Sequence, residues 1–304
     1  MEFTKYDLQT NNELSVLQFA TNNADTFNYV SLAEAIEKNF IVIKEINESA
    51  DVNNLYVINT SDQYVFMMDG DILQGAKQNR VLNTSVLLQP KSKGMIPVSC
   101  VERGRWSFVS DKFTHSDYTA PSRMRAKKSR HVRDSLKNFD EHRSNQREVW
   151  SDVDHYSNIL NIHSATDNLS DIYHKKQKSF NDQAMKFKVD PNANGVAIFI
   201  RKKLLSIDIF NRKNIHSSYF NKLVKGAAFE AINLKSTNEK PTKEEAYFKT
   251  ISLLDNLDKQ EYIIHRGVGV GNEKRYQSDE VSGFELSYKQ NLIHLSAINL
   301  SNEN

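Results

Sequence analysis

Val196-Ala197-Ile198-Phe199-Ile200, Arg201-Lys202-Lys203 and Leu204-Leu205-Ser206-Ile207-Asp208-Ile209-Phe210 follow one another without a break in this chain of 304 residues. Both apolar runs are rich in β-branched and aromatic residues, which favour strands. The three basic residues between them leave room only for a tight turn, so the stretch predicts a β-hairpin. Because a hairpin pairs its two strands antiparallel, an antiparallel sheet is the expected framework of the fold.

The chain before this hairpin is also rich in predicted strands. Apolar runs separated by short polar turns occur at residues 40–46, 55–58, 64–68, 81–88 and 95–101. Their short connections favour antiparallel pairing. Ser31 and Glu34 have the spacing of a capping box and predict a short helix that ends near residue 39. Residues 1–30 are polar with scattered aromatics, which predicts an irregular lead-in with one strand at most.

Helical spacing of apolar residues appears between residues 121 and 187, where we expect two or three helices. A further amphipathic helix is predicted around residues 219–231, and another begins after Pro241 with Thr242 as its N-cap. Strand-like segments close the chain. We therefore expect a single α+β domain over residues 1–304, with a mainly antiparallel sheet. Its parts are a β-rich segment at 40–110, a helical insertion at 121–187, and the hairpin, helices and closing strands at 195–300.

Composition excludes several classes of protein. Hydrophobic residues make up 39% and charged residues 26% of the chain, as in globular proteins. The net charge of +2 gives no global field that would attract nucleic acid or a membrane. No apolar run is long enough to span a membrane and no secretory signal is visible, so a cytoplasmic location is expected. The single cysteine and the scattered histidines predict no metal site, and no motif identifies a cofactor.

The densest group of polar residues runs from Asp69 to Arg80. Asp69-Gly70-Asp71 is a turn signal, and its carboxylates could simply cap backbone amides. Gln78-Asn79-Arg80 could hydrogen-bond a phosphate, a ribose or a carboxylate; the alternative is an exposed edge strand.

A second group follows in Cys100-Val101-Glu102-Arg103-Gly104-Arg105-Trp106. Strand alternation would place Glu102 on the face of Cys100 and Arg105 on the opposite face. Glu102 could act as an acid or base, and Trp106 could stack on a ring or fill the core. The lone cysteine is interpreted as a packing residue.

Three weaker signals lie elsewhere. Glu273 and Arg275 follow a glycine-rich stretch and could bind a ligand or form a surface ion pair. Asp208 interrupts an apolar strand, where it could be functional or face water. The basic segment 123–133 could receive phosphates, although a solvated helix face is the simpler interpretation.

These motifs resemble those of the ARG-and-rhodanese-phosphatase-associated protein domain family, where ARG denotes ADP-ribosylglycohydrolase. The resemblance is carried by Gly70 through Arg80 and by Pro97 through Trp106. It extends through Gln146-Arg147-Glu148-Val149-Trp150, Asp208-Ile209-Phe210, Gly269-Val270-Gly271 and Ile293-His294-Leu295. It implies a connection with NAD-derived or ADP-ribosyl compounds, and a shared pocket for Gln78, Arg80, Glu102 and Arg105.

The leading hypothesis is therefore a hydrolase acting on a nucleotide-like, phosphate-bearing small molecule, with Glu102 as acid or base. Asp71 or Asp208 would supply a second carboxylate. The predicted ligand-binding residues are Gln78, Asn79, Arg80, Arg105, Trp106, Glu273 and Arg275. One alternative is a sensor or partner protein that binds such a ligand without converting it, and another is an interaction scaffold held by buried ion pairs.

Overall fold

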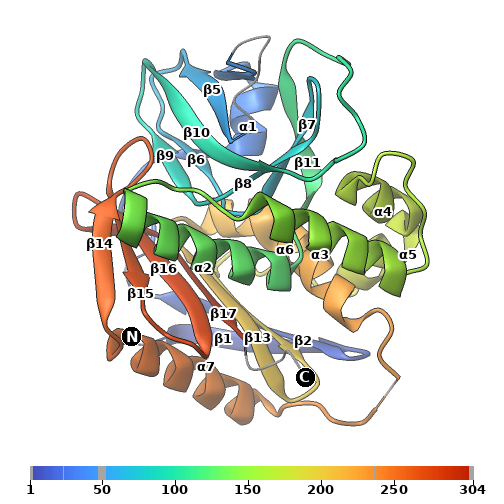
Figure 1. Ribbon diagram of the computed structural model, residues 1–304. Coiled ribbons are helices and arrows are strands. Elements are labelled where there is room, and N and C mark those ends of the chain that lie inside the picture. Colours follow the sequence, from blue (N-terminus) through green and yellow to red (C-terminus); the bar gives the residue numbers. More distant parts are fainter. Residues whose placement is uncertain (1–2, 23, 47–52, 236, 301–304) are drawn as a thin grey trace.

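A computed structural model describes residues 3–22, 24–46, 53–235 and 237–300, and it has an α+β fold (Figure 1). Its largest element is an antiparallel sheet of eight strands. In spatial order these are β1 (Phe3–Asn11), β2 (Leu14–Thr21), β12 (Gly195–Ile200), β13 (Lys203–Phe210), β17 (Asn291–Asn299), β16 (Val281–Tyr288), β15 (Asn272–Tyr276) and β14 (Tyr262–Arg266). The predicted hairpin at 196–210 is confirmed as β12 and β13, which lie in the middle of this sheet.

The expectation of an irregular N-terminal lead-in is wrong. Residues 3–21 form the hairpin β1–β2, and β2 pairs with β12, more than 170 positions along the chain. The first six residues of β2, Leu14 to Phe19, are all buried, although two of them, Ser15 and Gln18, are polar. Polar residues are compatible with this strand because Ser15 and Gln18 find hydrogen-bond partners inside the protein.

The β-rich segment forms two smaller sheets in the upper part of Figure 1. The first contains, in spatial order, β11 (Phe113–Thr119), β7 (Asp71–Gly75), β8 (Arg80–Leu82), β10 (Ser92–Cys100), β5 (Asn54–Asn59) and β4 (Ile41–Lys44). The second contains β3 (Val30–Ser31), β6 (Val65–Met67) and β9 (Val86–Leu88), with β3 and β6 parallel. The predicted helix after Ser31 is confirmed as α1 (Leu32–Glu37), with the Ser31 hydroxyl accepting the Glu34 amide N–H at 3.3 Å.

Helices separate the small sheets from the large one. The predicted insertion contains α2 (Ser122–Phe139), α3 (Gln146–Ile159), α4 (Leu169–Lys175) and α5 (Gln177–Ala184). Figure 1 shows α2, α3 and α6 (Lys213–Ala231) between the small sheets above and the large sheet below. The opposite face of the large sheet is covered by α7 (Lys243–Asp258), which begins with the predicted cap, Thr242, in a full capping box with Glu245.

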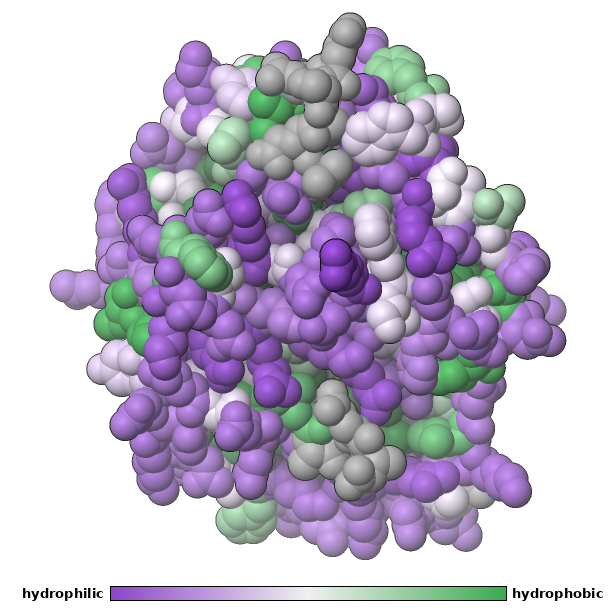
Figure 2. Space-filling model, viewed as in Figure 1, coloured by the Kyte–Doolittle hydropathy of each residue, from purple (hydrophilic) through white to green (hydrophobic). Residues whose placement is uncertain are grey.

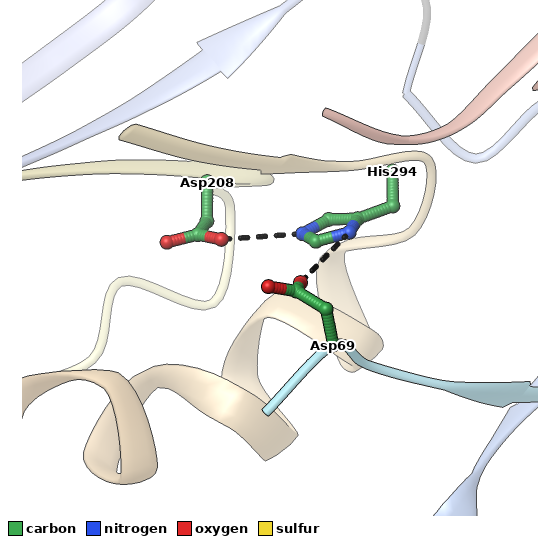
Figure 3. Close-up of side chains that lie close together, drawn as sticks. All are labelled: Asp69, Asp208 and His294. Atoms are coloured by element: carbon green, nitrogen blue, oxygen red, sulfur yellow. Dashed lines mark hydrogen bonds and ion pairs between the residues drawn. The ribbon is translucent and has the colours of Figure 1, made fainter. Parts of the chain in front are cut away.

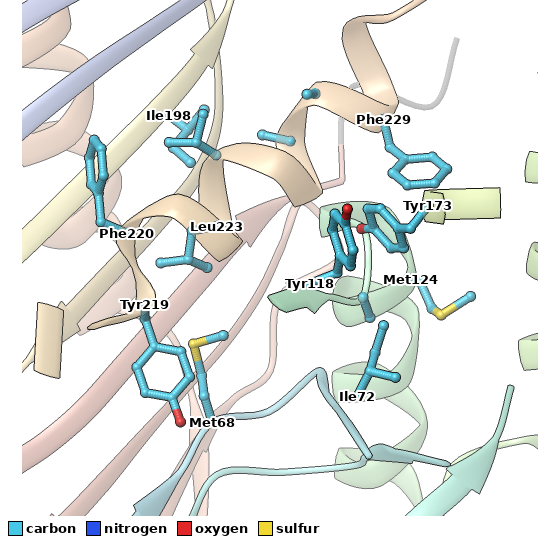
Figure 4. Close-up of a cluster of buried hydrophobic side chains, with 14 of the residues drawn as sticks. Met68, Ile72, Tyr118, Met124, Tyr173, Ile198, Tyr219, Phe220, Leu223 and Phe229 are labelled. Atoms are coloured by element: carbon cyan, nitrogen blue, oxygen red, sulfur yellow. The ribbon is translucent and has the colours of Figure 1, made fainter. Parts of the chain in front are cut away.

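The large sheet is therefore buried on both faces. Its upper face joins the small sheets and α6 in one apolar cluster, part of which is drawn in Figure 4, including Ile198, Phe220 and Leu223. Its lower face packs Leu17 and Ile207 against α7. A strand buried on both faces offers no position that faces water, and this decides the environment of Asp208.

The visible face of the molecule is mostly hydrophilic, with small apolar patches between charged side chains (Figure 2). Among the described helices, none is long and apolar enough to cross a membrane.

Candidate functional site

The Glu102 carboxylate lies in a closed hydrogen-bond network just beyond the end of β10. Arg105 donates from Nε to Oε1 at 2.8 Å and from Nη2 to Oε2 at 2.7 Å. The Asn79 amide N–H donates to Oε2 and the Thr166 hydroxyl to Oε1, both at 3.0 Å. Glu102 is buried, and each of its oxygens accepts two hydrogen bonds. Through these hydrogen bonds the Glu102 carboxylate holds Asn79, Arg105 and Thr166 in place.

The predicted alternation beyond Cys100 is wrong. β10 ends at Cys100, and Glu102 forms only an isolated bridge with Asn168. Because the chain turns there, Glu102 and Arg105 meet instead of facing opposite ways. Trp106 is 52% exposed, with the Lys77 ammonium 5.5 Å from its ring centroid.

Arg80 is fully buried and only partly satisfied. Its Nη1 donates to Gln78 Oε1 at 2.8 Å. Its Nη2 lies 3.6 Å from Oε1 of Glu45, beyond hydrogen-bond distance. Among the described residues, Arg80 Nε and Nη2 find no acceptor, and neither oxygen of Glu45 finds a donor. A cation and an anion thus lie side by side, each with unused hydrogen-bonding capacity.

The Cys100 thiol lies close to both Arg80 and Glu102. Cys100 is opposite Arg80 in the β8–β10 pair, and its sulfur is 3.1 Å from the Glu102 carbonyl oxygen. Burial raises the pKa of this thiol, against an opposing effect of the Arg80 charge. The indole N–H of Trp150 lies close enough to the thiol to favour its ionised form, which lowers the pKa of the thiol against the effect of burial.

A second buried polar cluster joins the small sheets to the large one. The Arg125 guanidinium, on α2, contacts Asp69 through Nε and Nη2, both at 3.0 Å, and Asp208 Oδ1 through Nη2 at 2.6 Å. Figure 3 shows the Asp69, Asp208 and His294 side chains pointing toward one another. His294 Nε2 lies 3.3 Å from Asp208, and its Nδ1 lies 2.9 Å from the Ser85 hydroxyl.

Asp208 does not face water in this arrangement. Burial alone would raise the pKa of its carboxyl, but Arg125 and His294 outweigh that effect and hold the pKa well below its usual range. Asp69, Asp208 and His294 offer ligand atoms within 4.8 Å of one another, close enough to surround a metal ion. Arg125 already contacts both carboxylates, so its guanidinium supplies the positive charge that they need.

Two of the basic residues in segment 123–133 are buried. Besides Arg125, Lys128 is buried and donates from Nζ to the Leu82 carbonyl oxygen at 2.6 Å. Burial lowers the pKa of Lys128 to about 7. The segment is therefore not simply a solvated helix face.

The remaining predicted site residues have separate partners. Asp71 accepts hydrogen bonds from Tyr219 at 2.7 Å and from the Met68 amide at 2.9 Å, so it does cap a backbone amide. Glu273 and Arg275 form an ion pair at 2.8 Å that is buried, not superficial. Burial would raise the pKa of Glu273, but Arg275 offsets this and the pKa is lowered to about 2.

The predicted site residues thus belong to several networks. Asn79, Glu102 and Arg105 share one, Gln78 and Arg80 form a neighbouring one, and Asp71, Asp208, Glu273 and Arg275 lie in the buried layer between the sheets. Sequence reasoning missed Glu45, Arg125, Ser85 and His294. Arg125 lies in the basic segment 123–133, and helical spacing places it on the face of α2 that also holds the buried Met124 and Lys128; His294 lies in one of the motifs of the family resemblance.

The family model of the ARG and rhodanese-phosphatase-superfamily-associated protein domain matches residues 3–298. The chain belongs to this family. Among curated proteins and solved structures, no significant match was found. The family name links the chain to the context of ADP-ribosylglycohydrolases and the rhodanese-phosphatase superfamily, and the resemblance seen in the sequence is confirmed.

Proposed function

We propose that this protein binds a phosphate-bearing, nucleotide-like ligand of the ADP-ribosyl type where Arg80 and Glu45 meet. The observation that carries the proposal is the unused hydrogen-bonding capacity of this buried pair. Leaving a buried polar group unpartnered costs about 1–3 kcal/mol, and more for a charged group. A ligand that satisfied both side chains would recover that cost.

The two side chains need complementary chemistry from the ligand. Arg80 lacks acceptors at Nε and Nη2, which phosphate oxygens supply in a geometry that suits a guanidinium. Glu45 lacks donors at both oxygens, which ribose hydroxyls supply. A ribose bearing a phosphate offers both groups within one small molecule. The Glu45 side chain is 13% exposed and that of Arg80 is fully buried, and both carboxylate oxygens of Glu45 are themselves buried.

Hydrolysis of the bound ligand is a second candidate function, favoured by the same free carboxylate. A general base must have an oxygen available to take a proton from water. Glu45 has two such oxygens, whereas the oxygens of Glu102, the residue predicted from sequence, all have donors. Glu45 is therefore our preferred base, and Glu102 positions Arg105 and Asn79.

A thermal-shift titration with ADP-ribose, NAD and inorganic phosphate tests binding. Wild-type protein should show a saturable rise in Tm with ADP-ribose or NAD, since a ligand of the native state stabilises it by mass action. Arg80→Met should abolish that rise, whereas Arg103→Met, which removes an exposed arginine paired with Asp154 and Asp167, should retain it. No rise in Tm with any of the three compounds would overturn the proposal.

Because Arg80 is fully buried and its variant can fail to fold, Glu45→Gln provides a second test. It should weaken ADP-ribose binding roughly tenfold, the effect of losing about 1.4 kcal/mol, and leave phosphate binding unchanged. Chromatography of ADP-ribose and NAD after long incubation then separates binding from turnover. If Glu45→Gln gives no product at a saturating ligand concentration, Glu45 is supported as the general base. If Glu45→Gln still gives product and only Glu102→Gln does not, Glu102 is the general base instead.

A further inference from the structure

A cavity of about 490 Å³ lies apart from the Arg80 site. It is bounded by the first turns of α2, the C-terminal end of α6 and the ends of β12, β13 and β17. Its apolar lining comes from Ala126, Ile200, Leu205, Leu234, Ile298 and Leu300. A mostly apolar cavity with a few convergent polar groups is the usual form of a small-molecule site.

The cavity is lined by both cationic and anionic side chains. Arg201 and Lys202 form the turn between β12 and β13, Lys203 begins β13, and all three line the cavity. The Arg201 guanidinium is engaged by Glu13 at 2.9 Å, and Lys202 lies 3.7 Å from Glu245. Lys203 has no acidic partner among the described residues and is exposed, so it is a cation available to a ligand; Arg123 also lines the cavity, and its charge acts on Glu230.

Glu230 lies at the end of α6 and lines the same cavity. Its Oε1 accepts the Tyr156 hydroxyl at 3.0 Å and the Arg123 amide N–H at 3.2 Å. Both of these hydrogen bonds go to the same oxygen, Oε1. Burial raises the pKa of this carboxyl, against the opposing effects of the Arg123 amide and the Tyr156 hydroxyl that donate to it.

We infer that this cavity binds a small amphipathic anion, with its apolar body against Leu205 and Ile298, its negative group at Lys203, and a hydrogen-bonding atom at Glu230. The inference is independent of the proposed function, because neither Arg80 nor Glu45 lines the cavity.

Two fluorescent probes of similar shape test the inference: 8-anilinonaphthalene-1-sulfonate, an anion, and N-phenyl-1-naphthylamine, which is uncharged. We expect one saturable site for the sulfonate on wild-type protein. Leu234→Trp should abolish binding of both probes, because Leu234 is a cavity residue with 39% exposure and a larger ring there fills the space without disturbing the core.

Charge variants identify the orientation of the ligand. Lys203→Glu should weaken sulfonate binding roughly five- to tenfold and leave the uncharged probe unaffected, since reversing one partly solvated charge acts only on a charged probe. Lys137→Glu, about 20 Å along α2 from the cavity by helix rise, is the matched control. Glu230→Gln should bind the sulfonate at least as tightly as wild type. Sulfonate binding that persists in Leu234→Trp, or that falls equally with Lys203→Glu and Lys137→Glu, would overturn the inference.

Discussion

At the scale of single residues, Lys128 shows the free-energy cost of burying a charged group in the layer between the sheets. Its ammonium group has one hydrogen bond, to a carbonyl oxygen, and the neighbouring Arg125 guanidinium repels it. Asp69 attracts it, but burial dominates and lowers the pKa to about 7. A lysine in the unfolded chain has a pKa near 10.4. The folded state therefore holds fewer protons than the unfolded state between these two values.

This difference predicts a pH-dependent stability. Between about pH 7 and pH 10 the free energy of unfolding should rise with pH, by up to about 1.4 kcal/mol per pH unit from this residue, since the unfolded state binds the extra proton. Below pH 7 both states are protonated and the contribution to the slope vanishes. Lys128→Met should remove the slope and stabilise the protein at pH 7, as measured by urea unfolding at pH 7, 8 and 9. Lys137→Met, at the exposed end of α2, should keep the wild-type slope; an equal slope in Lys128→Met would contradict the assignment.

At the scale of elements, the loop between β10 and β11 depends on Arg105. The guanidinium donates to the carbonyl oxygens of Ala76 at 2.7 Å and Ser107 at 3.0 Å, besides its two bonds to Glu102. The same loop exposes Trp106 and Phe108 to solvent, so apolar burial contributes little to its order. Charge-assisted hydrogen bonds to one buried carboxylate are the main restraint.

Loss of that restraint should open the loop locally. Arg105→Gln should increase the rate of chymotrypsin cleavage after Trp106 or Phe108 roughly tenfold or more, since hydrogen bonds to charged groups contribute about 1.5–3 kcal/mol each. The cleavage sites can be identified by mass spectrometry. Arg103→Gln removes a neighbouring arginine whose ion pairs are half-exposed, and it should leave the rate near the wild-type value. Similar rates for both variants would show that Arg105 is not the anchor.

Elements also show where sequence reasoning succeeds. Elements that local signals predict are confirmed. They are the β12–β13 hairpin, the helix capped by Ser31 and the helix capped by Thr242. Gly70 has a φ of +84°, as its turn position requires. The β1–β2 hairpin was missed because its stability comes from pairing with β12, a strand near residue 200. No sequence pattern within residues 3–21 indicates that β2 pairs with a strand so far along the chain.

At the scale of the whole molecule, the least predictable feature is the polar layer between the small sheets and the large one. Arg125 meets Asp69 and Asp208 across sequence separations of 56 and 83 residues. The sequence left open whether Asp208 is functional or faces water, and it does not face water because the sheet is covered on both faces. The pairing of each buried carboxylate with its cation depends on how the sheets stack. Neither the composition nor the hydrophobic periodicity of the sequence contains that information.

The sheet covered on both faces leads to a last prediction, for the N-terminal hairpin. Leu17 and Leu8 lie opposite each other in the β1–β2 register, but Leu17 is completely buried beneath α7 while Leu8 is only partly buried at the sheet edge. Leu17→Ala should lower the free energy of unfolding by about 2–5 kcal/mol, because it leaves a cavity in a close-packed core. Leu8→Ala, the same chemical change one strand away, should cost less than half as much, as measured by urea unfolding. Equal and small losses would mean that β2 is not an integral strand of the large sheet, and that residues 3–21 are the lead-in that their polar sequence suggests.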